Sequence, residues 1–268
     1  MMDFKSRFGF HATPFTRELR TQDRFALPVF DEALDALHAA VENRLSAALV
    51  APAGTGKTAL VRALLARLPE ARYRVRYVKV SGLSKRDTCR EIAVALGTEP
   101  AGSFPMLVRR LQEHAMRAFD TDGVRPVLVM DESQDLRREV LSMLKVLTNF
   151  EMDSKLVLSV VLVGQPPLAQ LLRHDDMEDV ARRIAHYATL RLLSREETAR
   201  YVAHRCTIAG SKEIPFDDAA KDALYEMGRG NLRATDRLAL KSLEVAHHQD
   251  AGVVSQVHVV EARRQAWP

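Results

Sequence analysis

The sequence is poor in the features of secreted and membrane proteins. It holds only two cysteines, Cys89 and Cys206, whose wide separation indicates neither a disulfide framework nor a metal-binding spacing. Its apolar runs stay far below the roughly 20 residues that a membrane-spanning helix needs. The first residues contain no apolar stretch of signal-peptide length. We therefore expect a cytoplasmic protein without a membrane partner.

The sequence also has no strong excess of one sign of charge over the other and no low-complexity tracts. Lysine and arginine number 39 and aspartate and glutamate 35, so the formal charge of +4 permits a nucleic-acid partner without requiring one. Apolar residues make up 47% of the 268 positions, enough to bury a sizeable core. Collagen-like and disordered chains are thereby excluded.

Short apolar and β-branched runs alternate with helical patterns through the first two-thirds of the chain, which is typical of a parallel sheet. The expected strands are residues 47–51, 73–80, 127–130, 157–163 and 188–192. After them, Ser194 with Glu197 forms a capping-box pattern, Asp217 is expected to begin a second helix, and a third follows Gly230. The predicted fold is α/β, with a sheet core over residues 1–193, N-terminal segment 1–30 included, and a small helical lid and tail over 194–268.

A phosphate-binding loop follows the first expected strand and precedes an amphipathic helix. The loop and the first helical residue are Ala51, Pro52, Ala53, Gly54, Thr55, Gly56, Lys57, Thr58 and Ala59. The glycines let backbone amides converge on phosphate oxygens, Lys57 is expected to reach the β- and γ-phosphates, and Thr58 to ligate Mg²⁺. Alanine replaces the usual first glycine of this motif, and a plain glycine turn is the alternative interpretation.

Two adjacent acids end the third expected strand. Asp131 and Glu132 would lie at the carboxyl edge of the sheet, where ligands of open α/β sheets bind. Asp131 is predicted to hold Mg²⁺ and Glu132 to polarise the attacking water as the general base. Acids after a strand also begin helices, so the pair gains its meaning from the phosphate loop before it.

Together these motifs resemble the AAA+ ATPases, and within them the branch that holds ExeA-type ATPases and the transposition regulators TnsC and MuB. The other stretches that carry the resemblance are Phe8 to Phe15, Leu147 to Asp153, Leu162 to Pro166, Arg182 to Ile184, Leu193 to Tyr201 and Gly228 to Arg233. The resemblance implies a P-loop NTPase fold, ATP and Mg²⁺ as ligands, ATP hydrolysis, and a homo-oligomer in the form of a ring or helical filament.

The resemblance also implies roles for single residues. Gln165 would sense the γ-phosphate, Arg233 of the lid would contact it, and Phe15 would pack near adenine. Arg182 or Arg183 would complete the site of a neighbouring copy, and the sequence does not choose between them. A strand-ending turn at Gln165, surface positions for the arginines and a plain core position for Phe15 are the alternatives.

A basic stretch indicates a nucleic-acid partner, and Arg109 with Arg110 is a weaker second candidate. Residues 72–90 contain seven basic side chains and one acid, Asp87. Lys79, Ser84, Lys85 and Arg86 are predicted to contact the phosphates of double-stranded DNA without sequence preference, because no aromatic residues interleave with them. A charged edge strand that discourages aggregation is the alternative.

The leading hypothesis is an ATP-dependent DNA-binding regulator of transposition, which assembles on target DNA and recruits or stimulates a transposase. An ExeA-like ATPase that energises an assembly process in secretion is the alternative function.

Overall fold

The computed structural model describes residues 4–79 and 82–266, which form two compact units. The sheet unit comprises Pro28–Pro52 and Lys57–Leu190, and the helical unit comprises Met1–Leu27, Ala53–Gly56 and Arg191–Pro268. Val80, the predicted last residue of the second strand, lies outside the described residues.

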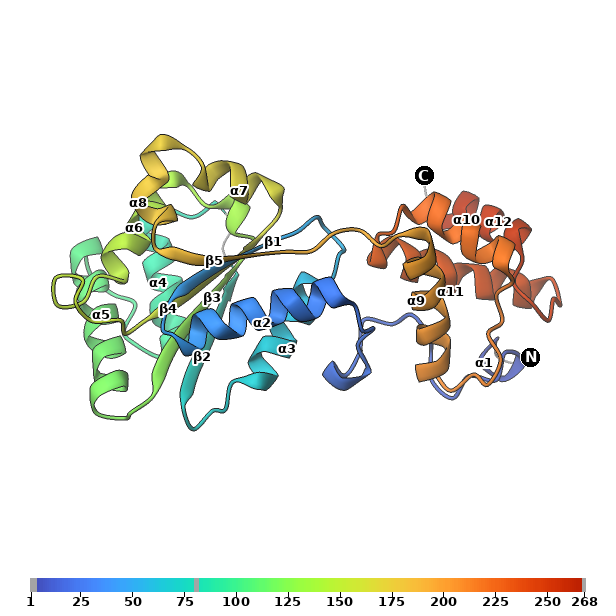
Figure 1. Ribbon diagram of the computed structural model, residues 1–268, viewed down its shortest axis with the longest axis horizontal. Coiled ribbons are helices and arrows are strands. Elements are labelled where there is room, and N and C mark those ends of the chain that lie inside the picture. The colour runs from blue at the N-terminus through green and yellow to red at the C-terminus, as the bar shows by residue number, and fades with distance from the viewer. Residues whose placement is uncertain (1–3, 80–81, 267–268) are drawn as a thin grey trace. The chain divides into compact units, whose positions relative to one another are not determined.

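Five parallel strands form the sheet in the order β2-β3-β4-β1-β5 (Figure 1). They are β1 (Ser46–Val50), β2 (Tyr73–Lys79), β3 (Arg125–Asp131), β4 (Ser159–Gly164) and β5 (Ile184–Thr189). The predicted parallel sheet is confirmed, but the expected position of its last strand was wrong, because β5 begins at Ile184 rather than at residue 188. β5 is an edge strand in which exposed residues alternate with buried ones, so it lacks the continuous apolar run that reveals a central strand.

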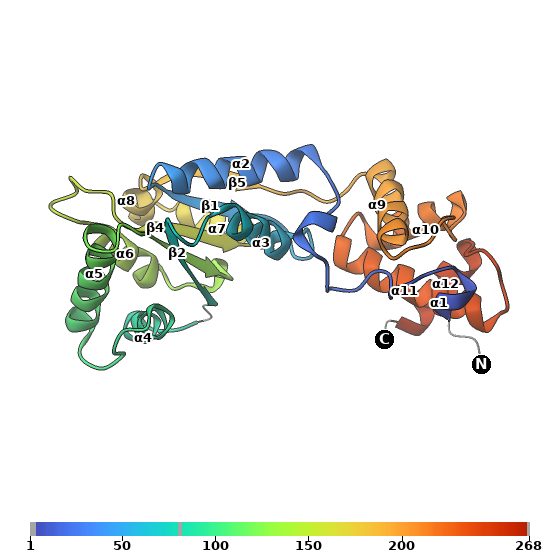
Figure 2. The same cartoon turned by 90° about the horizontal axis from the view of Figure 1, so that it is seen from below.

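Helices cover both faces of this sheet (Figure 2). Side chains alternate along each strand, and one set, which includes Val50, Leu128 and Leu162, shares a buried cluster with the helices of one face. Those helices are α4 (Lys85–Leu96), α5 (Phe104–Asp120) and α6 (Arg138–Leu147). The other face is covered by α2 (Pro28–Glu42) and α3 (Lys57–Arg67), and α7 (Pro166–Leu172) and α8 (Glu178–Ala181) lie between β4 and β5 in the chain.

The helical unit is built from α1 (Phe4–Arg7), α9 (Arg195–Ile208), α10 (Asp218–Gly228), α11 (Leu232–His248) and α12 (Gln256–Ala266). Ser194 and Glu197 form the capping box that the sequence predicts at the start of α9. Asp217 caps α10 by accepting a hydrogen bond of 2.6 Å from the amide of Ala220. The predicted helix starts therefore agree with the structure, since each depends on local hydrogen bonds.

The N-terminal segment groups with the helical unit, whereas the sequence analysis assigned residues 1–30 to the sheet core. Phe8, Phe10 and Phe15 are buried in the hydrophobic cluster of this unit, and the ring of Phe15 meets that of Phe216 edge-on at 6.0 Å. The physical reason is burial of large apolar surface: the helices need these rings to complete a core.

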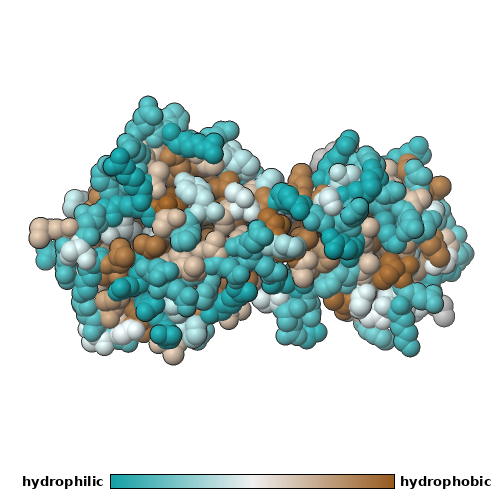
Figure 3. All heavy atoms as spheres, viewed as in Figure 1, coloured by the Kyte–Doolittle hydropathy of each residue, from teal (hydrophilic) through white to brown (hydrophobic). Residues whose placement is uncertain are grey.

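Hydrophilic residues predominate on the face shown in Figure 3, with hydrophobic residues in small separate groups. Among the described residues, no helix has the length and apolar character needed to traverse a bilayer.

Candidate nucleotide-binding site

The carboxyl ends of two neighbouring strands bring together an acid pair and two glutamines. Asp131 ends β3, Glu132 follows it, and Gln165 follows β4, the next strand of the sheet. Gln134, from the turn after Glu132, accepts a hydrogen bond of 2.9 Å from the backbone amide of Gln165. The structure thus assembles three residues that were predicted to act together, and it adds a fourth, Gln134, that the sequence analysis missed.

Glu132 is held in a left-handed backbone conformation, with φ of 57°. Its amide donates to Oδ1 of Asp131 at 2.9 Å, and its Oε2 accepts from Nε2 of Gln134 at 2.9 Å. Hydrogen bonds from Gln134 and Gln165, with the positive charges of Lys57 and Lys79, hold the pKa of this carboxyl below its usual range despite partial burial. Glu132 is therefore ionised at neutral pH and can accept a hydrogen bond from water.

Strand β2 supplies two further groups at this edge. The hydroxyl of Tyr77 donates to Oδ2 of Asp131, and burial together with this acid raises the pKa of the phenol. Lys79 pairs with Asp131 in the β2–β3 register and lies exposed at the end of its strand. Lys79 was predicted to contact DNA, and the structure places it beside the acid pair. No spacing rule pointed to Tyr77.

The phosphate loop leaves β1 and enters α3 at Lys57. The ammonium of Lys57 donates to the carbonyls of Ala51 and Pro52, at 2.9 and 3.0 Å. Thr58, on the first turn of α3, is exposed, and Ala51 is buried with its amide bonded to the carbonyl of Gly164 at 3.0 Å. This bond uses the backbone N–H alone, so it does not require glycine at position 51.

The tip of the loop, Ala53–Gly56, contacts the start of α11 within the helical unit. Nδ2 of Asn231 donates to the carbonyl of Ala53 at 2.6 Å, and a Cβ on Gly54 would lie 2.3 Å from Oδ1 of Asn231. Gly54 and Gly56 have φ of 75° and 100°, a region that favours glycine. These glycines serve both the backbone conformation and the close approach of Asn231, which the sequence analysis did not identify.

Three other predicted site residues lie away from this edge, and Arg233 lies beside the phosphate loop. Arg182 and Arg183 precede β5, at the amino edge of the parallel sheet, so the structure does not bring them to Asp131. Arg233 is exposed on the first turn of α11, and its amide bonds to the carbonyl of Gly54 at 3.4 Å. Phe15 is 4% exposed within the core of the helical unit. The roles of Arg233 at phosphate and of Phe15 at adenine stay predictions.

The remaining candidates for DNA contact surround the start of α4. The hydroxyl of Ser84 caps this helix by accepting from the amide of Asp87 at 3.2 Å, and it donates to the carboxylate of Asp87 at 2.6 Å. Lys85 and Arg86 begin the helix, and Nε of Arg86 donates to the carbonyl of Gly102 at 3.2 Å. Ser84 thus has a structural role of its own, and DNA contact by these residues stays a prediction.

The residues present fit a nucleoside triphosphate with Mg²⁺. The glycine conformations leave a loop whose amides can face an anion, and Lys57 donates to two carbonyls of that same loop. Asp131 offers carboxylate oxygen and Thr58 a hydroxyl, both hard ligands of the kind that Mg²⁺ prefers.

Comparisons with known proteins agree with this geometry. Residues 40–172 match the family described as AAA domain. General secretion pathway protein A of Aeromonas hydrophila is 32% identical over 200 residues, which are 74% of this chain and 36% of that protein. The chain therefore spans about a third of the length of this relative.

Several solved structures share the fold at lower identity. Cdc6p of Pyrobaculum aerophilum has a TM-score of 0.74 at 19% identity, covering 98% of this chain and 71% of its own. The ORC1 protein of Aeropyrum pernix in complex with DNA has a TM-score of 0.67 at 18% identity, with coverage of 94% and 68%. The RuvB Holliday junction branch migration motor of Thermotoga maritima has a TM-score of 0.59 at 20% identity, with coverage of 88% and 67%. The fold is that of P-loop AAA+ proteins.

Proposed function

Since the chain carries an AAA ATPase domain that uses ATP with Mg²⁺, we propose that it is an ATP-controlled DNA-binding oligomer that regulates transposition. In this proposal the ATP-bound copies assemble on double-stranded DNA, recruit or stimulate a transposase, and separate after hydrolysis. The observation that carries the ATP-dependent part of this proposal is the joint placement of Asp131, Glu132, Gln134 and Gln165 at one sheet edge, with Lys57 contributing to the electrostatics of Glu132.

The roles within one chain follow from these contacts. Backbone amides of the loop and Lys57 grip the phosphates, while Thr58 and Asp131 would hold Mg²⁺, which supplies positive charge to the phosphate oxygens. Ionised Glu132 accepts a proton or hydrogen bond from the attacking water. The side chain of Gln165 forms a hydrogen bond with the carboxylate of Glu132. A movement of Gln165 on contact with the γ-phosphate would therefore directly move the carboxylate that orients the water.

A neighbouring copy completes the site in this proposal. Arg182 and Arg183 lie at the amino edge of the sheet, opposite the edge that holds Asp131 in the same chain. An arginine at that edge can reach the phosphates of a second copy, where its positive charge would stabilise the transition state. Hydrolysis then depends on assembly, so the copies hydrolyse ATP only after they have assembled on DNA.

The DNA surface proposed here consists of Lys79, Ser84, Lys85 and Arg86. Lys85 and Arg86 place positive charge at the amino end of α4, where the helix macrodipole disfavours cations. Helix stability therefore does not explain them, whereas a phosphate would be attracted both by these side chains and by the helix terminus. Of the structural neighbours, the ORC1 protein was solved in complex with DNA, and the RuvB protein is a Holliday junction branch migration motor.

A second function is supported by one observation, the similarity to General secretion pathway protein A. In that case the ATPase would energise an assembly step in secretion, and DNA would have no part in it. The transposase partner rests on the resemblance to transposition regulators described from the sequence.

DNA binding separates the two functions. We expect a random-sequence duplex to bind at least ten times more tightly when the protein holds a slowly hydrolysed ATP analogue than when it holds ADP, at about 0.1 M salt. Lys57→Ala is the control, because loss of the phosphate-gripping ammonium should remove this nucleotide dependence while leaving the DNA surface intact. Equal DNA binding in both nucleotide states would reject the regulator and favour the secretion function. A transposase that co-purifies with the filament would identify the partner.

A further inference from the structure

The two adjacent arginines at the start of β5 differ sharply in their surroundings. Arg183 forms a two-pronged ion pair with Asp153, with its Nη1 and Nη2 at 2.8 and 2.6 Å from the two carboxylate oxygens. Arg182, at the end of α8, pairs through one nitrogen with Glu178 of that helix, at 2.5 Å. The side chain of Arg183 is 24% exposed and that of Arg182 is 73% exposed. One arginine is held in place and the other is a surface side chain.

Asp153 belongs to a short hairpin, residues 149–155, whose backbone is strained. Glu151, Met152 and Asp153 all adopt left-handed φ values, of 48°, 57° and 68°. Such conformations are uncommon for residues other than glycine and persist where the surroundings hold them. The hairpin closes through a bridge between Phe150 and Lys155, and Oδ1 of Asn149 accepts from the amide of Asp153 at 3.0 Å.

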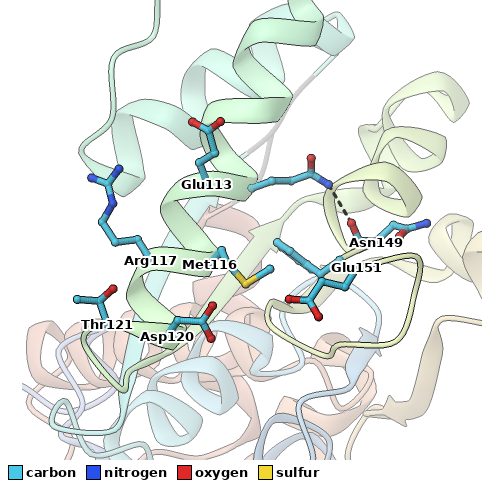
Figure 4. A pocket seen from close by; sticks show the side chains of 9 residues that line it. Glu113, Met116, Arg117, Asp120, Thr121, Asn149 and Glu151 are labelled. Carbon is cyan, nitrogen blue, oxygen red and sulfur yellow. Dashed lines mark hydrogen bonds between the residues drawn. The ribbon is translucent and has the colours of Figure 1, made fainter.

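Helix α5 anchors the other side of the 149–155 hairpin. Nζ of Lys155 contacts both carboxylate oxygens of Asp120, at 2.8 and 3.0 Å, and Nε2 of Gln112 donates to the carbonyl of Asn149 at 3.0 Å. Phe150 is buried against this helix. Figure 4 shows Asn149 and Glu151 facing Met116 and Asp120 across an open cavity. Contacts with α5 thus hold both ends of the 149–155 hairpin, and Asp153 lies between these ends.

Arg183 lines a small crevice together with Leu144 and Val180. A larger hollow of about 530 Å³ is lined by both Arg182 and Arg183 and by Asp153. An exposed ion pair adds little to stability, so stability alone gives no reason to maintain three left-handed residues for it. A fork held by two of its five N–H donors still presents three to another ligand.

We propose that Asp153 is a positioning residue that orients Arg183, and thereby selects Arg183 over Arg182 as the arginine given to the nucleotide of a second copy. This role rests on the trans arginine of the proposed function. Asp153 is the residue, and the 149–155 hairpin the element, that orients this arginine before assembly. Orientation before assembly removes part of the entropy cost of ordering a long side chain when copies meet. The hairpin therefore acts in the copy that donates the arginine and not in the copy that hydrolyses ATP.

Mixed oligomers test this placement. Glu132→Gln chains keep Arg183 but cannot activate water, and Arg183→Ala chains keep a complete nucleotide site but donate no arginine. Each alone should be nearly inactive, and their mixture should recover turnover. Absence of recovery would overturn the trans arginine of the proposed function and this inference with it.

Asp153→Gly is then placed in one chain type at a time, because glycine accepts the φ of 68° without the carboxylate. In the Glu132→Gln chain it should lower turnover of the mixture about five- to tenfold. In the Arg183→Ala chain it should change nothing. Recovery in the parent mixture with equal losses in both placements, no loss in the donor, or a rise in turnover would overturn the inference while leaving the trans arginine intact.

Two further variants complete the experiment. Asp153→Asn in the donor chain keeps one accepting oxygen and tolerates the left-handed backbone, so it should give an intermediate loss. Glu178→Gln in the donor chain frees Arg182 instead and should leave turnover unchanged. A loss with Glu178→Gln as large as that with Asp153→Gly would contradict the selection of Arg183.

Discussion

At the scale of single residues, the backbone of Glu132 is the feature on which the chemistry depends. A left-handed residue directly after a buried strand turns its side chain away from the strand direction, and the hydrogen bond from its amide to Asp131 locks that turn. The left-handed backbone of Glu132 costs free energy locally. Hydrogen bonds from Gln134 and Gln165 to the carboxylate hold the residue in this conformation where the strand ends meet. Strain at this position supports a working role for Glu132.

Glu132→Gln should retain ATP binding and lose turnover by about 10²–10⁴-fold, because the amide keeps the shape of the side chain but cannot accept the proton of the water. Nucleotide affinity and single-turnover hydrolysis would be measured side by side. Glu139→Gln, at an exposed acid of α6, is the matched control and should behave as the unmodified protein. Hydrolysis at an undiminished rate in Glu132→Gln would refute the assignment of the base.

Gln134→Ala should shift the acid limb of turnover to higher pH. Gln134 is the largest cause of the lowered pKa of Glu132, so without it the carboxylate takes up a proton earlier as the solution is acidified. The charge that orients water is then lost at a higher pH than in the unmodified protein. Turnover measured from pH 4 to 8 checks this, with the exposed Gln170→Ala as control; superimposable limbs would contradict it.

Single residues also show what a sequence can predict about a site. Lys57, Asp131 and Glu132 could be found because a strand followed by a glycine loop or by acids fixes where backbone and charge must lie. Tyr77 and Gln134 could not, because their contacts depend on the register of β2 with β3 and on the turn after Glu132. The same holds for Asn231, whose contact with Ala53 joins residues 178 positions apart.

At the scale of elements, local hydrogen bonds predict helix starts better than apolar runs predict strand positions. The caps at Ser194 and Asp217 lie where the sequence puts them, since a cap involves residues three apart. The predicted strand lay too far along the chain because the residues of β5 are half exposed. The apolar run near residue 190, which indicated the strand, follows β5 instead. The N-terminal aromatic residues could be recognised as core residues, but only the structure shows which core they enter.

Helices α9 and α11 share a buried polar group that should make the helical unit sensitive to pH. Asp236 accepts from the hydroxyl of Tyr201 at 2.7 Å and lies 3.4 Å from Arg205, yet burial raises the pKa of its carboxyl to about 6. The group favours the folded state most below its unfolded pKa near 3.8, and this contribution is lost as the pH rises through 6. The full loss amounts to about 2–3 kcal/mol.

Asp236→Asn should therefore flatten the pH dependence of unfolding between about pH 4 and 7, because the amide carries no charge to bury. Hydrogen exchange of the amides of α11 in the intact chain measures the opening free energy of this unit. The difference between the unmodified protein and the variant isolates Asp236 from carboxyls such as Glu197, whose pKa is lowered to about 2 by Arg191. A difference that stays constant with pH would show that Asp236 does not titrate in this range.

At the scale of the whole molecule, the chain divides into a sheet unit and a helical unit, and the division falls within the phosphate loop. The segment Ala53–Gly56 belongs by its contacts to the helical unit, while Lys57 and Thr58 begin a helix of the sheet unit. The phosphate loop therefore contributes residues to each of the two units.

The DNA proposal concerns the whole assembly, and salt dependence tests it best. Lys85→Ala with Arg86→Ala should weaken binding to a random duplex and lower the slope of log affinity against log salt by about 2, since each phosphate contact releases roughly 0.9 counterion. Nucleotide affinity should stay unchanged because neither side chain forms part of the phosphate loop. Lys212→Ala with Arg264→Ala removes the same net charge from exposed positions of the helical unit and should keep the slope. If both double variants change the slope alike, long-range charge rather than contact at the start of α4 governs DNA binding.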